Sequence, residues 1–242
     1  MIKRFTLIAI LVLMRLSLFA QNWGGGVDNE LLHFGFTFQY ISSEYKILKK
    51  KDWRAPFTDP ETNALVSDSL YSISSPPTPG FGLGFVSDLA LGDHANLRFT
   101  PAMVFTDRLL DYNYLDTTQF RQKKVSATMI DLPIGIKLKS DRRNNFRAYL
   151  IGGLKYSVDI ISKKKTNDEG LDFSEKFVKN KRGILSYEAG IGFDFYFEFF
   201  KLSPEIKLSN SVNSVLKSEV NPYSSPLDKL FLRNLQFSLY FE

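Results

Sequence analysis

The residue types that most often perform acid–base, nucleophilic or metal chemistry are scarce in this sequence. It contains no cysteine and only two histidines, His33 and His94. The absence of cysteine excludes thiol catalysis, disulfide bonds and thiolate metal sites. A hydrolase would need a histidine beside a serine or an aspartate, at a place that substrate can reach. Each histidine instead borders a predicted strand, at the end of the molecule away from the long connections, and we expect both to be interfacial polar residues.

Carboxylates occur close together at Asp59 and Glu61 and at Asp168 and Glu169. Loop carboxylates of this kind can touch a cation. Their spacing does not match the twelve-residue calcium loop, in which oxygen ligands recur at fixed positions, so solvated surface acids are the better interpretation. We therefore predict a protein that is not an enzyme, with no catalytic residue, no cofactor and no metal site.

The dominant pattern in the chain is the alternation of apolar with polar or small residues, which places alternate side chains on opposite faces of a β-strand. In the clearest segment, residues 189–199, the odd positions are apolar or aromatic and the even positions are Gly, Asp, Tyr or Glu. Comparable alternation occurs in segments 33–40, 81–85, 97–105, 130–139, 146–159, 202–208 and 234–241. The sequence therefore predicts about eight strands.

The predicted connections alternate between short and long. Short turns fall near residues 91–95, 140–145 and 200–201, and long polar segments fall near residues 41–79, 107–124, 161–183 and 210–229. Transmembrane barrels show this alternation, with short periplasmic turns and longer outer loops. The prediction is an all-β, antiparallel, up-and-down transmembrane barrel of about eight strands, with both termini in the periplasm.

The first twenty residues have the pattern of a secretory signal peptide. Lys3 and Arg4 precede an apolar stretch that ends at Ala20, a small residue suited to the cleavage site. A retained membrane anchor is the alternative, but Arg15 within the stretch disfavours a stable span of about 20 apolar residues. We expect a signal peptide over residues 1–20 and an outer-membrane β-barrel domain over residues 21–242.

The charge of the chain gives no reason to expect nucleic-acid binding. Three of its basic residues lie in the leader, and the remaining 28 stand against 26 acidic residues. Lysine runs at residues 49–51 and 163–165 sit at the bases of predicted outer loops. They would meet lipopolysaccharide phosphates or remain solvated. Outer-membrane lipid and lipopolysaccharide are therefore the expected surroundings.

A soluble barrel with its apolar face turned inward would show the same alternation. Three features favour the membrane. The non-apolar face is rich in Gly and Tyr, which suits a crowded lumen better than a wet surface. The apolar face is almost continuously aromatic from Phe193 to Phe199, and the chain ends on an aromatic strand, with Glu242 after Phe241. Only a closed barrel satisfies every backbone N–H and C=O group of strands in hydrocarbon.

The inward face of the predicted strands carries both charge signs. The expected lumen charge network comprises Arg98, Lys137, Arg147, Lys155, Glu188, Asp194, Glu198, Glu205 and Lys207. An eight-stranded barrel has room only for side chains or one small ligand. Because buried charges persist when they are paired, a network that fills the lumen is the favoured interpretation. An ion or substrate path is the alternative.

Several segments together resemble the PorT family of outer-membrane barrels from the type IX secretion system of Bacteroidetes. The resemblance lies in residues 33–36 (HFGF), 131–137 (DLPIGIK), 144–156 (NNFRAYLIGGLKY) and 192–207 (GFDFYFEFFKLSPEIK), the last including the distinctive Ser203-Pro204-Glu205. It covers most of the strands and leaves out the outer loops. The resemblance implies a role in protein secretion and gliding motility, with other secretion-system proteins as partners.

The resemblance implies a helper rather than a conduit, because so narrow a barrel cannot pass a folded protein. Trp53, Phe57 and Tyr71 in the long first loop are the predicted extracellular contact. Two other functions stay open. One is a small adhesion or ligand-binding barrel unrelated to secretion, and the other is a carrier of a small hydrophobic molecule.

Overall fold

The computed structural model describes residues 31–116, 119–160, 168 and 170–242. The predicted signal peptide, residues 1–20, lies outside these ranges. No helix that is long and apolar enough to cross a membrane occurs in the part of the chain that the structure describes. The wall of the molecule consists of β1 (Leu32–Lys49), β5 (Thr78–Ala90), β6 (Ala95–Phe99), β7 (Ala102–Tyr114), β8 (Phe120–Lys139), β9 (Phe146–Asp159), β11 (Gly183–Tyr196), β12 (Lys201–Ser211) and β14 (Leu227–Phe241).

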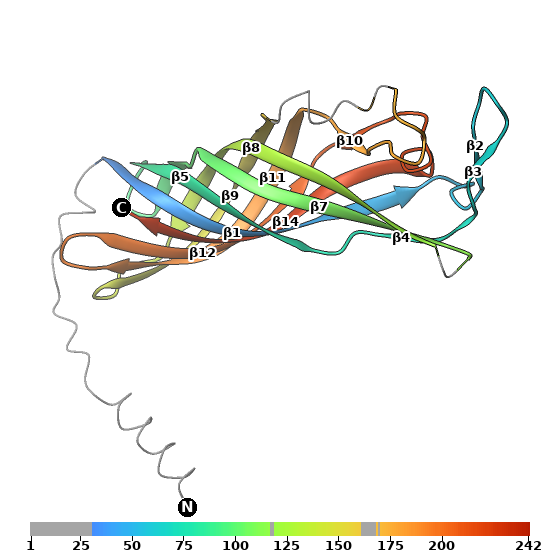
Figure 1. Ribbon diagram of the computed structural model, residues 1–242. Helices are drawn as coiled ribbons and strands as arrows, with labels where there is room; N and C mark the ends of the chain where they lie inside the picture. The colour runs from blue at the N-terminus through green and yellow to red at the C-terminus, as the bar shows by residue number, and fades with distance from the viewer. Residues whose placement is uncertain (1–30, 117–118, 161–167, 169) are drawn as a thin grey trace, which may run out of the picture.

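These strands form a closed antiparallel ring. Apart from β6 and β7, each wall strand pairs with the next along the chain, and β1 closes the ring by pairing with both β14 and β5. β6 and β7 follow one another at Thr100 and Pro101 and both pair with β8 and with β5, so they act as one wall strand. Counted in this way the ring has eight strands, which confirms the predicted fold class. Figure 1 shows the end of β14 beside the beginning of β1.

The connections at the end where β1 begins and β14 stops are short, at residues 91–94, 140–145 and 197–200, as predicted. We call this end the terminal end and the other the loop end. The loop-end connections hold the small strands β2 (Phe57–Thr58), β3 (Leu65–Ser67), β4 (Leu70–Ser74), β10 (Lys179–Asn180) and β13 (Leu216–Lys217). β2 pairs with β3, β10 with β13, and β4 extends the wall beside β7.

Two of the predicted long loops are wrong in extent. β1 continues to Lys49. β7 continues to Tyr114 and β8 begins at Phe120, and the two strands are paired from Asn113↔Phe120 toward the terminal end. The segments 41–49 and 107–114 are therefore strand rather than loop. They escaped prediction because their alternation changes phase with respect to the part of each strand that precedes it.

That change of phase divides the barrel into two halves. In the half near the terminal end, aromatic and aliphatic side chains point outward, as Phe36, Phe38 and Phe85 do, while polar residues such as Thr37 and Gln39 point inward. Beyond Tyr40 the arrangement inverts. The interior of the loop half is an apolar cluster, formed by Ile41, Tyr45, Leu70, Ile73, Leu110, Tyr112, Tyr114, Met129, Val178, Ile184, Val215, Leu216, Tyr223, Leu227, Leu230 and Leu232 among others.

The inversion matches a change in the surroundings of the barrel, from lipid around the terminal half to water around the loop half. An apolar exterior is stable against lipid, and an apolar interior is stable against water, so each half buries its apolar side chains away from water. The terminal half thus has the pattern of a membrane barrel, and the loop half has the pattern of a water-soluble one.

Close contact between β8 and β9 depends on glycine. A Cβ added at Gly153 would lie 2.1 Å from the carbonyl oxygen of Ile134 and 2.5 Å from the Cα of Gly135. At Gly92, in a terminal-end turn, nothing lies within 4 Å of an added Cβ. Glycine is therefore required at position 153 by packing, and position 92 tolerates a side chain.

Candidate functional site

The interior of the terminal half holds a network of buried ion pairs with Arg98 at its centre. Arg98 is 1% exposed. Its Nη2 lies 2.7 Å from Asp88 Oδ2 and 2.6 Å from Glu242 Oε1, and its Nη1 lies 3.5 Å from Glu205 Oε2. The ring of Tyr240 lies 4.7 Å from the Arg98 guanidinium carbon. One arginine on β6 therefore connects β5, β12 and the last residue of the chain.

Lysines extend this network toward the terminal end. Lys137 Nζ lies 2.8 Å from Asp194 Oδ1 and 3.8 Å from Asp88 Oδ2. Lys201 Nζ lies 2.7 Å from Glu242 Oε2, and the backbones of Lys201 and Glu242 exchange two hydrogen bonds. The C-terminal residue is thus held inside the barrel by its side chain and its main chain.

A second branch runs toward the loop end. Lys207 Nζ lies 3.1 Å from Glu205 Oε1 and 3.7 Å from Glu188 Oε2. Lys155 Nζ lies 3.1 Å from Glu188 Oε1 and 3.2 Å from Asp131 Oδ2, so it links these two carboxylates. Carboxylates and cations alternate along the branch, so each buried charge has an opposite neighbour.

Two tyrosines complete the coordination of the central carboxylate. The hydroxyl of Tyr149 donates to Glu205 Oε2 at 2.9 Å, and that of Tyr240 donates to Glu205 Oε1 at 3.0 Å. Both rings are buried, and the ring of Tyr149 also lies 4.0 Å from Lys137 Nζ. A cavity lined by Arg98, Glu188 and Lys207 has a volume of only about 10 Å³. The arrangement fills the lumen.

The structure brings together seven of the nine residues predicted for this network: Arg98, Lys137, Lys155, Glu188, Asp194, Glu205 and Lys207. Arg147 lies half-buried on β9, opposite Asp194 on β11. The prediction for Glu198 is wrong, because Glu198 is exposed in the turn between β11 and β12. The strict alternation of residues 189–199 runs three residues beyond the strand, which stops at Tyr196.

Sequence reasoning missed Asp88, Asp131, Lys201 and Glu242. Asp131 already stood on the polar face of its strand and could have been included. Lys201 lies in a predicted turn, Asp88 lies between the predicted strand 81–85 and the turn near residues 91–95, and Glu242 follows Phe241. Its position after Phe241 looked like a departure from a barrel terminus, whereas its carboxylate is part of the lumen network.

The two histidines lie at the terminal end of the barrel. His94 is exposed, with Nε2 3.7 Å from Asp141 Oδ1. His33 is half-buried at the beginning of β1. Among the residues that the structure describes, no three histidine or acidic side chains are grouped so that they could hold a metal ion.

Connections close the loop end of the barrel. The segment between β12 and β14 turns inward, so that Asn221, Tyr223 and Ser224 are buried. Tyr112 donates a hydrogen bond to the carbonyl of Tyr223 at 2.8 Å, and Tyr223 donates to the carbonyl of Ser174 at 2.7 Å. This segment caps the apolar cluster.

An ion pair holds the preceding connection in place. Lys179 on β10 contacts Asp168 and lies 3.2 Å from Glu219. Burial alone would raise the pKa of Asp168, but hydrogen bonds from Lys179 and from the Phe177 amide outweigh it, so the pKa lies below its ordinary value. Asp168 is therefore ionised and paired at neutral pH.

The three predicted contact residues of the first loop lie in different surroundings. Trp53 is partly buried against the apolar cluster, with Lys49 Nζ 4.0 Å from its ring. Phe57 packs against Phe173 of another loop, at 5.6 Å between ring centroids. Tyr71 on β4 is 63% exposed. Of the three, Tyr71 is the one with most of its ring free for a contact.

A cavity of about 1220 Å³ lies at the side of the barrel, lined by residues of β7, β8 and the segment around β10. β8 pairs with β7 from Phe120, but with β9 only from Met129. Among the residues described, the last link between them is a hydrogen bond of 2.9 Å from the Ile160 amide to the Thr128 carbonyl. Beyond this point the cavity separates β8 from the segment around β10.

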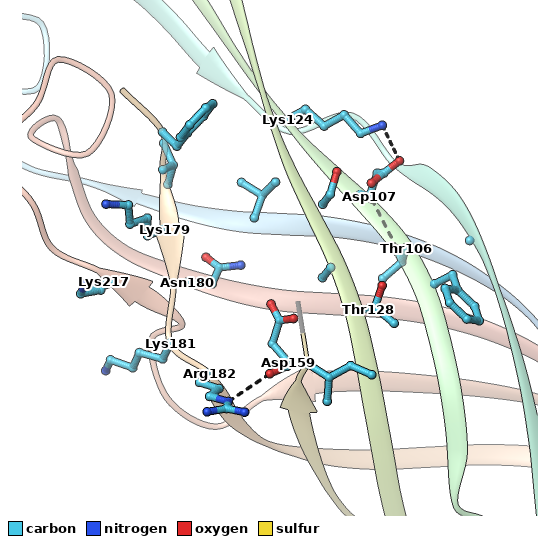
Figure 2. Close-up of a pocket in the computed structure, with 18 of the residues that line it drawn as sticks. Thr106, Asp107, Lys124, Thr128, Asp159, Lys179, Asn180, Lys181, Arg182 and Lys217 are labelled. Carbon is cyan, nitrogen blue, oxygen red and sulfur yellow. Dashed lines mark hydrogen bonds and ion pairs between the residues drawn. The ribbon is translucent and has the colours of Figure 1, made fainter. Parts of the chain in front are cut away.

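Figure 2 shows the two sides of this cavity. Lys124 and Asp107, paired at 2.6 Å, and Thr128 lie on the β7–β8 side. The side around β10 carries Lys179, Asn180, Lys181, Arg182 and Lys217. Sequence reasoning gave no indication of this cavity, because it depends on where β9 stops relative to β8.

A closed ring of eight antiparallel strands, with an apolar aromatic exterior around a charged interior, defines an integral outer-membrane β-barrel. A family model described as "Outer membrane protein beta-barrel domain" matches residues 19–217. The chain belongs to this family, and the protein is located in the outer membrane. No curated protein matches it.

Solved structures of outer-membrane proteins are similar in fold. OprG from Pseudomonas aeruginosa is 14% identical, with a TM-score of 0.43 over 87% of this chain and 93% of that one. Neisserial surface protein A is 11% identical, with a TM-score of 0.40 over 87% and 98% of the two chains. Ail of Yersinia pestis, solved with a heparin analogue, is 11% identical, with a TM-score of 0.36 over 86% and 96%.

Proposed function

We propose that this barrel is a non-enzymatic, non-conducting accessory component of type IX protein secretion. The structural observation that carries the proposal is the filled lumen. A barrel whose interior is closed by the Arg98 network offers no path for a polypeptide, so its contribution must come through its surfaces. The resemblance of residues 131–137, 144–156 and 192–207 to PorT proteins supports the choice of secretion system.

The proposed partners are other secretion-system proteins and the lipid and lipopolysaccharide around the barrel. The loop end offers them exposed apolar side chains, with Leu65 65% and Tyr71 63% exposed. Exposed aromatic and aliphatic side chains are the usual anchors of a protein–protein contact. Val220, on another loop, is 64% exposed and provides a matched comparison.

The test is deletion of the gene in its native host, followed by comparison of the secreted and surface proteomes with those of the parent strain. We expect a general loss of exported cargo that the wild-type gene restores. An unchanged secretome would overturn the proposal, and altered adhesion with intact secretion would indicate an adhesion barrel instead.

Complementation with variants locates the contact. The double variant L65S/Y71S is expected to restore export less well than V220S, at equal amounts of folded protein in the outer membrane. Equal restoration by both would exclude this part of the first loop as the partner surface.

A further inference from the structure

The cavity in the barrel wall combines an apolar surface with a basic one. Its lining includes Phe81 and Phe105, whose rings stack at 5.0 Å on the outer face of the wall, with Phe81 56% exposed. Exposed Ile160 lines it as well. The apolar part of the cavity is therefore continuous with the aromatic exterior of the terminal half, which faces lipid.

The basic part lies on the side toward the loop end. Five cations line the cavity, Lys124, Lys179, Lys181, Arg182 and Lys217, against two lining carboxylates, Asp107 and Asp159. Lys124 is paired with Asp107, and Lys179 and Lys217 share Glu219 at 3.2 Å each. Lys181 is exposed and has no ion-pair partner among the residues described. Arg182 donates from Nε to the Asp159 carbonyl at 3.2 Å, so Lys181 is the cation of the lining that is available to an anion.

Two further groups, Asn180 and Arg108, also favour a ligand that combines hydroxyl groups with negative charge. Asn180 donates a hydrogen bond to the hydroxyl of Tyr45, while its Oδ1 is buried without a hydrogen-bond partner in the described residues. A buried amide oxygen that lacks a donor can accept a hydrogen bond from a ligand hydroxyl. Behind the lining, Arg108 is 1% exposed and, within the described ranges, has no carboxylate within ion-pairing distance. Its charge adds to the positive potential of the cavity.

We propose that this cavity binds a phosphorylated glycolipid of the outer leaflet. The acyl chains would lie against Phe81, Phe105 and Ile160, and the phosphate would lie near Lys181 and Arg182. A sugar hydroxyl would donate to Asn180 Oδ1. The volume, about 1220 Å³, exceeds the roughly 300–1,000 Å³ of ordinary small-molecule sites and suits part of a large amphiphile. The site is independent of the proposed role in secretion.

The binding test uses the full mature chain in a non-ionic maltoside detergent, with native mass spectrometry as the readout. The probes are bis-phosphorylated lipid A, the same lipid without phosphates, and inorganic phosphate. We expect one retained lipid A, about tenfold weaker binding of the dephosphorylated lipid, and no displacement by inorganic phosphate. Equal binding of the two lipids would overturn the proposal, as would displacement by phosphate, which would indicate a free-phosphate site.

Charge reversal supplies the matched control. K181E/R182E is expected to weaken lipid A binding about tenfold or more, whereas K50E/K51E, with the same change of net charge at residues outside the cavity, is expected to leave it unchanged. Both variants must show the wild-type heat-dependent mobility in gels. Equal loss in the two variants would mean unspecific attraction and overturn the site.

Placement is tested separately with a lipid that carries a photoreactive diazirine in its acyl chain. Cross-links are expected in residues 79–81, 105–107 and 159–160, which line the apolar part of the cavity. Labels spread evenly around the lipid-facing wall would overturn the proposal even if K181E/R182E were to fold poorly.

Discussion

Replacing Arg98 by methionine tests whether the buried network stabilises the barrel. The change removes the guanidinium and keeps most of the side-chain volume. It leaves Asp88, Glu205 and Glu242 without their shared partner, at contacts of 2.7, 3.5 and 2.6 Å. Breaking a buried ion pair from one side costs about 3–5 kcal/mol, because the remaining charge is left uncompensated.

The structure indicates the lower part of that range. Each carboxylate keeps one lysine after the substitution: Asp88 keeps Lys137 at 3.8 Å, Glu205 keeps Lys207 at 3.1 Å and Glu242 keeps Lys201 at 2.7 Å. We therefore expect R98M to lower the free energy of unfolding by about 3 kcal/mol. D88N/R98M should lose less than the sum of the two single variants, since it removes one of the stranded charges.

The assay is reversible urea unfolding in lipid vesicles, followed by the intrinsic fluorescence of the two tryptophans, Trp23 and Trp53, and by gel mobility. R233M is the control, because Arg233 is exposed and forms a surface pair with Glu44 at 3.6 Å. Such a pair contributes about 0–1 kcal/mol. If R98M loses no more than R233M, the network does not stabilise the barrel and the reasoning is refuted.

Four further outcomes follow from the same geometry. The purified wild-type barrel in a planar bilayer is expected to show no steady conductance, and regular current steps would contradict a filled lumen. Glu205→Gln is expected to cost about 3 kcal/mol in urea unfolding, because it discharges a carboxylate bound by Lys207 and two tyrosines, whereas exposed Glu198→Gln should change stability by less than about 0.5 kcal/mol. Gly153→Ala should cost about 1–3 kcal/mol through the clash with Ile134, and Gly92→Ala should be neutral; equal unfolding midpoints would refute the packing argument. Because the pKa of Asp168 is lowered in the folded protein, its pair with Lys179 is complete above the unfolded pKa and is lost as pH falls through the lowered one. The protection factors of amides in residues 170–180, which are exchange rates corrected for the intrinsic pH dependence, should therefore fall in acid, and Asp168→Asn should remove that dependence.

The sequence predicted the fold well because period-two alternation survives in the terminal half of nearly every wall strand. It failed where that alternation changes phase. In β14, Leu230 and Leu232 point inward, whereas Leu235, three residues after Leu232, and Phe237 point outward. A strand that is predicted from one constant alternation therefore ends at such a point, and the residues beyond it are assigned to a loop.

The lumen network was predictable only in part, for a related reason. Residues in the middle of a strand, such as Lys137 and Asp194, could be assigned a face from their neighbours. Lys201 and Glu242 lie at strand ends, where the face is set by pairing between distant segments. The wall cavity depends on the relative lengths of β8 and β9, which no local pattern encodes.

The position at which each strand changes phase also marks the bilayer boundary, and it can be read from the sequence. Between Tyr40 and Ile41, and between Leu232 and Leu235, the outward residues cease to be suited to hydrocarbon. Joined around the ring, such points trace the height at which the bilayer ends and the aqueous exterior begins. The same sequence thus records how deeply the barrel sits in its membrane, and shifting that boundary by one pair of residues would require every strand to change together.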